Sequence, residues 1–208
     1  IEPLEDEFGI KSNHRVGRFS NVAQSQEYHD RIEAINFSLA RDDGQSAKNL
    51  DRADVILVGA NTARREGYGP PRSPHQRVAV VSRSAQFDFD VPLWTSGQAL
   101  LILPTDAPDV PVPSIRAGVG TSDLGAALPH LDASVIQAEG GPTLNGMLAD
   151  ADLVDELNLT ISPQLNGGTG ARLTAGAPEL ATPMQLAHVL EDTGFLFTRY
   201  VRHDNLGG

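Results

Sequence analysis

The chain has 208 residues, no cysteine and a formal net charge of −11 at pH 7. Without cysteine it has no disulfide, thiolate metal site or cysteine nucleophile, and its acidity argues against nucleic acid as a partner. At 40% hydrophobic residues it can bury one core. It has no long apolar run and no visible secretory signal, so we expect a cytoplasmic protein with no membrane partner.

The first 59 residues contain one predicted helix and one predicted strand. Ser25 can cap a helix over about 26–41, where apolar residues recur on one face, and Asp42-Asp43-Gly44 ends it. Residues 54–58 form a continuous apolar run, as in strands buried on both faces of a parallel sheet. We therefore expect this strand at the centre of the fold.

The middle of the chain predicts two more buried strands, at 77–82 and 99–103. A loop containing Trp94 separates them. A proline-rich connector then runs from Pro104 to Pro113, and a short helix is expected from Asp123 to Leu131.

The last third alternates strand and helix, then ends in a hairpin. The predicted elements are a strand at 133–138, a helix at 142–150, a strand at 155–162, a flexible loop at 167–170, and an antiparallel pair at 185–191 and 194–203. Alternating strands and helices with a final hairpin predict a single α/β domain over 1–208, with a mixed sheet and flanking helices.

The most informative motif joins the strand at 133–138 to the helix at 142–150. It is the run Glu139-Gly140-Gly141-Pro142-Thr143-Leu144. Proline is tolerated at the first helical position. Two glycines let backbone N–H groups approach a ligand, and the helix start adds partial positive charge. These are the properties of a phosphate cradle, although a plain strand–turn–helix junction has the same pattern.

Four ordered motifs between residues 53 and 203 resemble the reductase domain of the bacterial riboflavin-biosynthesis deaminase/reductase. They are AEGGPTLNGMLADADLVDELNLTISPQLNGG from Ala138, ADVILVGANT from Ala53 with RREGYGP after it, VAVVSR from Val78, and GFLFTRYV from Gly194. The resemblance implies a dihydrofolate-reductase-like fold, a homodimer, and hydride transfer from NADPH to a phosphorylated pyrimidine intermediate of riboflavin synthesis. The cofactor carries that chemistry, and the protein supplies position and electrostatics.

Residues 1–59 resemble a different family, the bacterial phosphoenolpyruvate synthetase regulatory protein, a kinase/phosphorylase. In that family the strand DVILVG leads into a phosphate loop that ends in Gly-Lys-Thr. Here Val58-Gly59 is followed by Ala60-Asn61-Thr62-Ala63-Arg64-Arg65, and the chain has no Gly-Lys-Thr. A phosphate-loop kinase needs the lysine and the hydroxyl to hold phosphate and Mg²⁺, so the kinase function is not carried over.

We therefore expect a chimera in which a segment of different origin, residues 1–53, precedes a reductase-like core at 54–203. Reductases of this family begin with a strand that ends near a Ser-Leu-Asp-Gly element, and none occurs before Asp54. The missing strand should leave a gap in the sheet or an exposed edge, which residues 1–24 or a partner chain could fill. A divergent natural reductase is the alternative.

The resemblance also implies a set of site residues. Those expected at the cofactor are Thr62, Glu66, Ser82, Arg83, Gly140, Gly141, Pro142, Thr143 and Leu144, and those expected at the substrate are Glu139 and Arg72. A hydroxyl with a guanidinium, as at Ser82 and Arg83, suits the 2′-phosphate that distinguishes NADPH from NADH. Each residue has a structural alternative: Thr62 can cap a turn, and Glu66 can be a surface carboxylate.

The remaining polar residues form weaker patterns. Five arginines fall within a short span and form either an anion site or a solvated basic face: Arg64, Arg65, Arg72, Arg77 and Arg83. The six histidines show no spacing typical of a metal site. Two functions remain open on the sequence alone. The chain is an NADPH-dependent reductase with impaired turnover, or it is a non-catalytic chimeric fold.

Overall fold

A computed structural model describes residues 53–165, 172–179 and 181–202. The helix expected at 26–41 and the loop expected at 167–170 lie outside the described residues.

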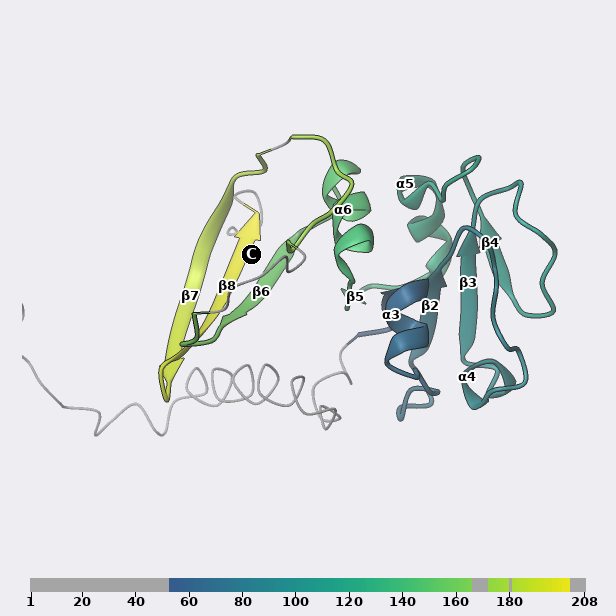
Figure 1. Cartoon of the computed structure of the whole chain (residues 1–208), viewed down its shortest axis with the longest axis horizontal. Coiled ribbons are helices and arrows are strands. Elements are labelled where there is room, and N and C mark those ends of the chain that lie inside the picture. Colours follow the sequence, from purple (N-terminus) through teal and green to yellow (C-terminus); the bar gives the residue numbers. More distant parts are fainter. Residues whose placement is uncertain (1–52, 166–171, 180, 203–208) are drawn as a thin grey trace, which may run out of the picture.

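A five-stranded parallel sheet lies at the centre of the first part of the fold (Figure 1). Its strands are β1 (Val55–Gly59), β2 (Arg77–Val81), β3 (Ala99–Leu103), β4 (Ser114–Arg116) and β5 (Ile136–Ala138), in the order β4-β3-β2-β1-β5. Every neighbouring pair is parallel. The helical segments are α3 (Ala60–Arg65), α4 (Pro92–Thr95), α5 (Leu124–Ala127) with the 3₁₀ turn η2 (Leu128–Leu131), and α6 (Pro142–Asp150).

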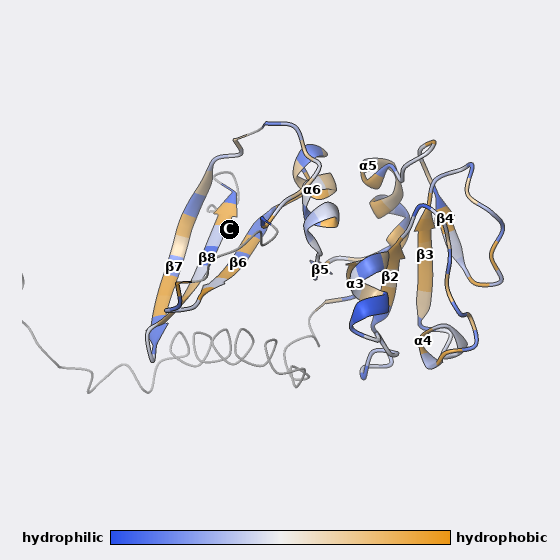
Figure 2. Ribbon diagram, viewed as in Figure 1, coloured by the Kyte–Doolittle hydropathy of each residue, from blue (hydrophilic) through white to orange (hydrophobic). Residues whose placement is uncertain are grey.

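The core lies on both faces of this sheet. On one face Leu57 and Ile102 pack with Leu144 of α6, and on the other Val58 and Leu101 lie in a second apolar cluster. Figure 2 shows β2 and β3 as hydrophobic along their lengths. The apolar runs of the sequence predicted this arrangement, because a strand covered on both faces has no polar side.

A three-stranded antiparallel sheet forms the second part. Its strands are β6 (Glu156–Ile161), β7 (Met184–Asp192) and β8 (Phe195–Arg202), in the order β6-β8-β7. The predicted final hairpin is confirmed, and Thr193 and Gly194 make its turn with φ of 51° and 83°. The expected α/β class with a parallel sheet and flanking helices is present, but the expected mixed sheet is divided in two.

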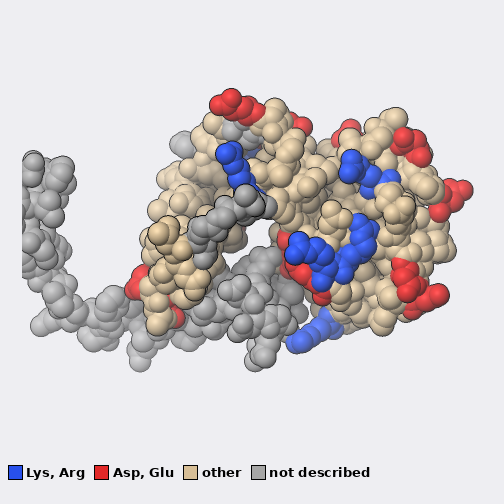
Figure 3. Space-filling model, viewed as in Figure 1, with Lys and Arg blue, Asp and Glu red and all other residues tan. Residues whose placement is uncertain are grey.

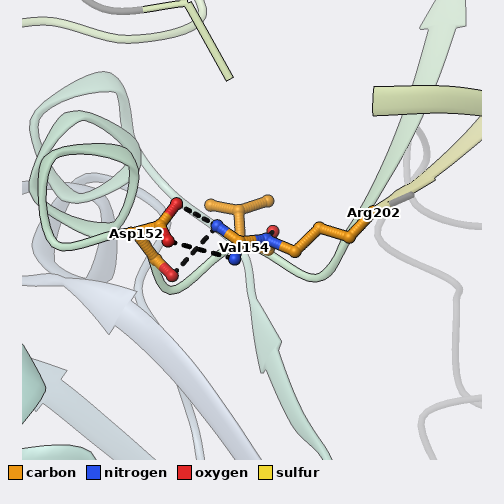
Figure 4. Close-up of polar contacts among 3 residues, drawn as sticks. All are labelled: Asp152, Val154 and Arg202. Atoms are coloured by element: carbon orange, nitrogen blue, oxygen red, sulfur yellow. Dashed lines mark hydrogen bonds and ion pairs between the residues drawn. The ribbon is translucent and has the colours of Figure 1, made fainter. Parts of the chain in front are cut away.

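An arginine joins the end of β8 to the loop between α6 and β6 (Figure 4). Arg202 donates from Nε to the Val154 carbonyl at 2.9 Å and from Nη1 to Asp152 Oδ2 at 3.1 Å. Its Nη2 also pairs with Asp152 Oδ1. These bonds hold the end of β8, the central strand of the second sheet, to the segment that follows α6.

Acid should weaken the fold through three carboxylates. The pKa of Asp54 is lowered by the N–H groups of Val135 and Ser134, and that of Asp152 by Arg202. Burial raises the pKa of Glu156, but hydrogen bonds from Arg199 and Asn158 outweigh burial and lower it overall.

A lowered pKa in the folded state stabilises the fold above the ordinary values of 3.8 and 4.5. That stabilisation is lost as pH falls through the lowered values. We expect the urea midpoint to fall from about pH 5 downwards. Glu156→Gln should reduce this fall in the urea midpoint. If the variant shows the same dependence of the midpoint on pH as the parent chain, Glu156 does not contribute to the acid sensitivity.

Candidate cofactor site

The predicted site lies at the carboxyl ends of the parallel strands, where open α/β sheets bind ligands. β1 ends at Gly59 and leads directly into α3, while β5 leads through Glu139-Gly140-Gly141 into α6. The Gly59 N–H donates to the Gly140 carbonyl at 2.7 Å, so the two strand ends lie side by side. A strand followed by a helix therefore occurs twice at the carboxyl ends of neighbouring strands, directly at β1 and through the Gly-Gly turn at β5.

Thr62 of α3 contacts the Gly-Gly turn at the carboxyl ends of the strands. The Gly141 N–H donates to Thr62 Oγ1 at 2.9 Å, and a Cβ on Gly141 would lie 3.0 Å from that oxygen. Gly140 has a φ of +81°, which favours glycine. The structure therefore brings Thr62 and the turn together, although it also gives Thr62 the structural role of holding that turn.

The start of α6 presents backbone N–H groups at the same edge. Its N-cap is Gly141, no side chain caps it, Pro142 occupies the first turn, and no acidic residue follows there. The N–H groups of a first helical turn have no partner within the helix and carry partial positive charge. This helix start can hold an anionic group such as a pyrophosphate.

Glu139 is held by two partners beside this turn. The Tyr68 hydroxyl donates to Glu139 Oε2, and Gln137 Nε2 donates to Oε1 at 3.1 Å. Neither Tyr68 nor Gln137 is among the site residues expected from the sequence. The only signal for Tyr68 in the sequence is an aromatic residue between two glycines, Gly67 and Gly69, in the stretch RREGYGP. The contacts fix a half-buried carboxylate next to the Gly-Gly turn.

Ser82 and Arg83 follow β2 but differ in exposure. Ser82 is 4% exposed, and its Oγ accepts from the Ala85 N–H at 3.2 Å. Arg83 is exposed. The serine thus has a structural role in the turn after β2, and Arg83 is the side chain of this pair that can reach a bound anion.

The remaining predicted residues lie on the surface. Glu66 ends α3, and both Glu66 and Arg72 are exposed. Among the described residues, no hydrogen bond or ion pair joins either side chain to the Gly-Gly turn.

The five arginines between Arg64 and Arg83 do not share one role, because some of them bind backbone carbonyls and others are exposed. Arg64 donates to the Gln86 carbonyl at 3.0 Å and lies 5.0 Å from the centre of the Phe87 ring. Arg77 donates to the Leu131 carbonyl. Figure 3 shows basic side chains gathered over α3, whose last turn carries Arg64 and Arg65. This cluster is therefore partly structural and is not a single anion site.

A segment from 172 to 179 packs against the first turns of α6. The Ala175 N–H donates to the Pro142 carbonyl at 2.9 Å, and Asn145 Nδ2 donates to the Leu173 carbonyl at 3.0 Å. Because Pro142 begins α6, this segment supports the start of the helix that forms one wall of the candidate site.

The described residues contain neither a cluster of metal-ligating side chains nor a helix that could cross a membrane. No group of three His, Asp or Glu side chains there could hold a metal ion. None of the helices in that part of the chain has the length and apolar character that a membrane span requires.

Comparison with known sequences finds a match at the start of the chain. Residues 1–64 match the kinase/pyrophosphorylase family. A relative in Methylibium petroleiphilum, described as a phosphoenolpyruvate synthase regulatory protein, is 79% identical over 61 residues, which are 29% of this chain and 22% of the relative. A relative of the same description in Leptothrix cholodnii is 75% identical over the same length. The chain therefore spans about a fifth of the length of these relatives.

Comparison with solved structures finds a different group of proteins. A pyrimidine reductase-like protein from Corynebacterium diphtheriae has a TM-score of 0.62 and 24% identity, over 90% of this chain and 85% of that one. Acinetobacter baumannii RibD has a TM-score of 0.60 and 15% identity, over 79% and 50%. The diaminohydroxyphosphoribosylaminopyrimidine deaminase/5-amino-6-(5-phosphoribosylamino)uracil reductase of Thermotoga maritima has a TM-score of 0.57 and 15% identity, over 72% of this chain and 45% of that one. At these identities the likeness shows the fold. The chain therefore joins a segment similar to the kinase/pyrophosphorylase family to a body with the fold of the riboflavin-biosynthesis pyrimidine reductases.

Proposed function

We propose that the chain binds NADPH across the carboxyl ends of β1, β2 and β5, as a cytoplasmic reductase of the 5-amino-6-(5-phosphoribosylamino)uracil reductase type with impaired turnover. The observation that carries this proposal is the Gly140-Gly141 turn, which lies at the uncapped start of α6 and is held by Thr62.

The residues present fit a dinucleotide. A side chain at Gly140 would approach Asn145, and a side chain at Gly141 would approach Thr62. Glycine at both positions keeps the turn open, so that a bound ligand can lie close to its backbone. The turn and the first residues of α6, Pro142, Thr143 and Leu144, would hold the pyrophosphate. When bound, NADPH supplies the hydride.

The other residues would orient the two ligands. The exposed guanidinium of Arg83 would bind the 2′-phosphate, with Ser82 shaping its turn. The fixed carboxylate of Glu139 would accept hydrogen bonds from N–H or O–H groups of a phosphorylated pyrimidine substrate. Arg72 would bind the substrate phosphate, and Glu66 would lie near the cofactor.

A second candidate function is supported by the divided sheet. β5 and β6 are not paired with each other, so the described residues lack a strand at the side of the sheet next to Glu139. A substrate pocket with an open wall would bind cofactor without positioning substrate for hydride transfer. Under this alternative the chain is a recombined or engineered chimera without enzymatic activity.

Calorimetric titration with NADPH and, in parallel, NADH tests the proposal. Tight NADPH binding with weak NADH binding would support the cofactor site, and a turnover assay with the phosphorylated pyrimidine would then separate the two candidates. Failure to bind either nucleotide would overturn the reductase proposal.

Arg83→Gln should narrow the preference for NADPH over NADH. Loss of one charged hydrogen bond to the 2′-phosphate should weaken NADPH binding about tenfold, while NADH binding stays unchanged. Titration of the parent chain and the variant with both nucleotides measures this ratio. If the variant binds NADPH and NADH more weakly by the same factor, Arg83 does not contact the 2′-phosphate. The matched control is Arg65→Gln in α3, which should leave the binding of both nucleotides unchanged.

We also propose that the protein forms a homodimer through the antiparallel sheet. The register of the three strands places four large apolar side chains on one face of this sheet. Their exposed fractions are 47% for Ile161, 48% for Leu186, 48% for Val189 and 38% for Leu196. Exposed apolar patches of this kind mark association surfaces.

Leu186→Lys should therefore shift the protein from dimer to monomer in sedimentation velocity. A buried, unpaired charge in the interface would weaken the dimer by about 100-fold or more. Gln185→Lys, on the opposite face of β7, is the matched control and should leave the dimer intact. A monomeric parent chain would contradict the dimer itself.

A further inference from the structure

The segment that follows β2 and carries Arg83 is held at its start by two hydrogen bonds. The Ser82 N–H donates to the Ile102 carbonyl at 3.0 Å, which extends the pairing of β2 with β3. The Ser82 Oγ accepts from the Ala85 N–H at 3.2 Å, and this bond closes a turn around Arg83. We call residues 82–89 the β2 loop.

This turn requires an unfavourable backbone conformation at Ala85. Ala85 has a φ of +52°, in the left-handed region, where the Cβ of an L-residue crowds the following carbonyl oxygen. Its methyl group is nevertheless buried in the apolar cluster on that face of the parallel sheet. A residue keeps such a backbone only when its surroundings over-determine it. The β2 loop therefore depends on contacts from other elements.

Arg64 of α3 supplies one of these contacts. Its Nη1 donates to the Gln86 carbonyl at 3.0 Å, and its Nη2 donates to Asn61 Oδ1 at 2.8 Å. Because Asn61 lies one turn earlier in α3, its amide oxygen fixes the direction of the guanidinium. The guanidinium carbon lies 5.0 Å from the centre of the Phe87 ring, within the range of a cation–π interaction. Arg64 thus contacts two successive residues of the β2 loop.

Phe87 connects the β2 loop to a buried aromatic group. The centre of its ring lies 5.0 Å from that of Trp94, in an edge-to-face arrangement, and 6.3 Å from that of Phe89. Phe89 in turn lies 5.6 Å from Trp94, which belongs to α4 and is buried. Aromatic pairs at these separations attract one another. The β2 loop is therefore held between the guanidinium of Arg64 and the apolar core.

The helix α3 contacts both parts of the candidate cofactor site. Thr62 accepts a hydrogen bond from the Gly141 N–H, and Arg64, two residues later, contacts the β2 loop. α3 also packs against β2 as well as β1. One short helix thus keeps the Gly-Gly turn and the backbone of Arg83 in a fixed relation to each other.

We propose that Arg64 is a positioning residue for nucleotide selectivity, which holds the β2 loop so that Arg83 can pair with the 2′-phosphate of NADPH. This inference rests on the proposed NADPH site. Both Nη atoms of Arg64 donate within the protein, so its contribution to binding passes through Arg83. NADH lacks the 2′-phosphate, and its binding should not depend on the position of Arg83.

The test is a double-mutant cycle of Arg64→Met and Arg83→Gln in the full chain, with calorimetric titration of NADPH and NADH. Methionine keeps an unbranched apolar side chain and removes the charge and the donors. Arg64→Met alone should weaken NADPH binding about fivefold, because a displaced loop loses part of the bond from Arg83, and should leave NADH binding unchanged. In a chain that already carries Arg83→Gln, Arg64→Met should have no further effect on either nucleotide.

Trp94 gives a second readout that needs no nucleotide, because it is the only tryptophan of the chain. Arg64→Met should increase the quenching of Trp94 fluorescence by acrylamide, since Phe87 loses its cation and covers the indole less well. Arg65→Met, at the next position of α3, is the matched control and should change neither readout. Arg64→Lys keeps a cation for Phe87 and a donor for Gln86, so it should restore most of the preference for NADPH.

The inference alone is overturned if the parent chain prefers NADPH and Arg64→Met leaves that preference intact. Additive effects of Arg64→Met and Arg83→Gln would also overturn it, because Arg64 would then act on the nucleotide without Arg83. So would equal weakening of NADPH and NADH, which indicates a structural role, or unchanged quenching of Trp94. If the parent chain binds neither nucleotide, the proposed function fails, and this inference fails with it.

Discussion

Gly141→Asp is expected to weaken NADPH binding by more than about 100-fold, or about 2.8 kcal/mol. The new carboxylate would stand at the start of α6, where the pyrophosphate is proposed to bind, and like charges repel strongly at such a site. Its Cβ would also lie 3.0 Å from Thr62 Oγ1, which the Gly141 N–H now contacts. Calorimetric titration of the variant and of the parent chain measures the change.

This variant should keep its fold, so loss of binding would report on the site. Gly141 is the N-cap of α6 with extended backbone at φ −75° and ψ −160°, a position that aspartate and asparagine favour. Gly141→Asn is the matched control, because it adds the same shape without charge and should cost only about tenfold. Binding of NADPH by Gly141→Asp with the affinity of the parent chain would show that the turn is not the pyrophosphate site.

Elements with strong local signals could be predicted from the sequence. The helix α6 has the predicted bounds, because Pro142 suits a first helical turn and two glycines precede it. The buried strands β1, β2 and β3 appear within a residue or so of their predicted ends, because an unbroken apolar run is typical of a strand covered on both faces of a parallel sheet.

Short elements gave no such signal. The six residues of α3 follow β1 without a capping side chain, and α4 has four residues. The three-residue strand β4 depends on pairing with β3 and directly follows the proline-rich connector. Tertiary contacts decide such elements, and local propensity does not predict them.

The candidate site could be predicted only in part, because its contacts join distant segments. Thr62 and Gly141 are 79 residues apart in the chain, and Tyr68 and Glu139 are 71 apart. The motifs that resemble the reductases indicated the first pair. Nothing in the local pattern indicated that Tyr68 would hold Glu139, or that Ser82 would be buried in a turn.

The two resemblances overlap in the segment that supplies one side of the site. The match to the kinase/pyrophosphorylase family extends to residue 64 and so includes β1 and most of α3. Thr62 lies within that match, whereas Gly141 lies in the reductase-like body. Thr62 also lies within residues 54–203, which resemble the reductases, so this bond joins the segment where the two resemblances overlap to the Gly-Gly turn.

Gly146→Ala should lower the free energy of unfolding by about 2 kcal/mol, although replacing glycine by alanine inside a helix usually raises it. An alanine Cβ at this position would lie 2.2 Å from the Ala175 carbonyl oxygen. The segment at 172–179 would have to move away from α6, which would weaken its bonds to Pro142 and Asn145. Each bond contributes about 1 kcal/mol, so the loss exceeds the gain in helix propensity. Urea unfolding of the parent chain and the variant measures the difference.

The matched control is Gly125→Ala in α5, where the new Cβ would approach only Asp123 Oδ1, at 3.4 Å. This change should leave the free energy of unfolding unchanged or raise it by up to about 1 kcal/mol. If Gly146→Ala behaves like Gly125→Ala, the segment at 172–179 does not pack on α6 in solution. The start of α6 would then lack that support, and the Gly-Gly turn would be held by its bonds to Thr62 and Gly59.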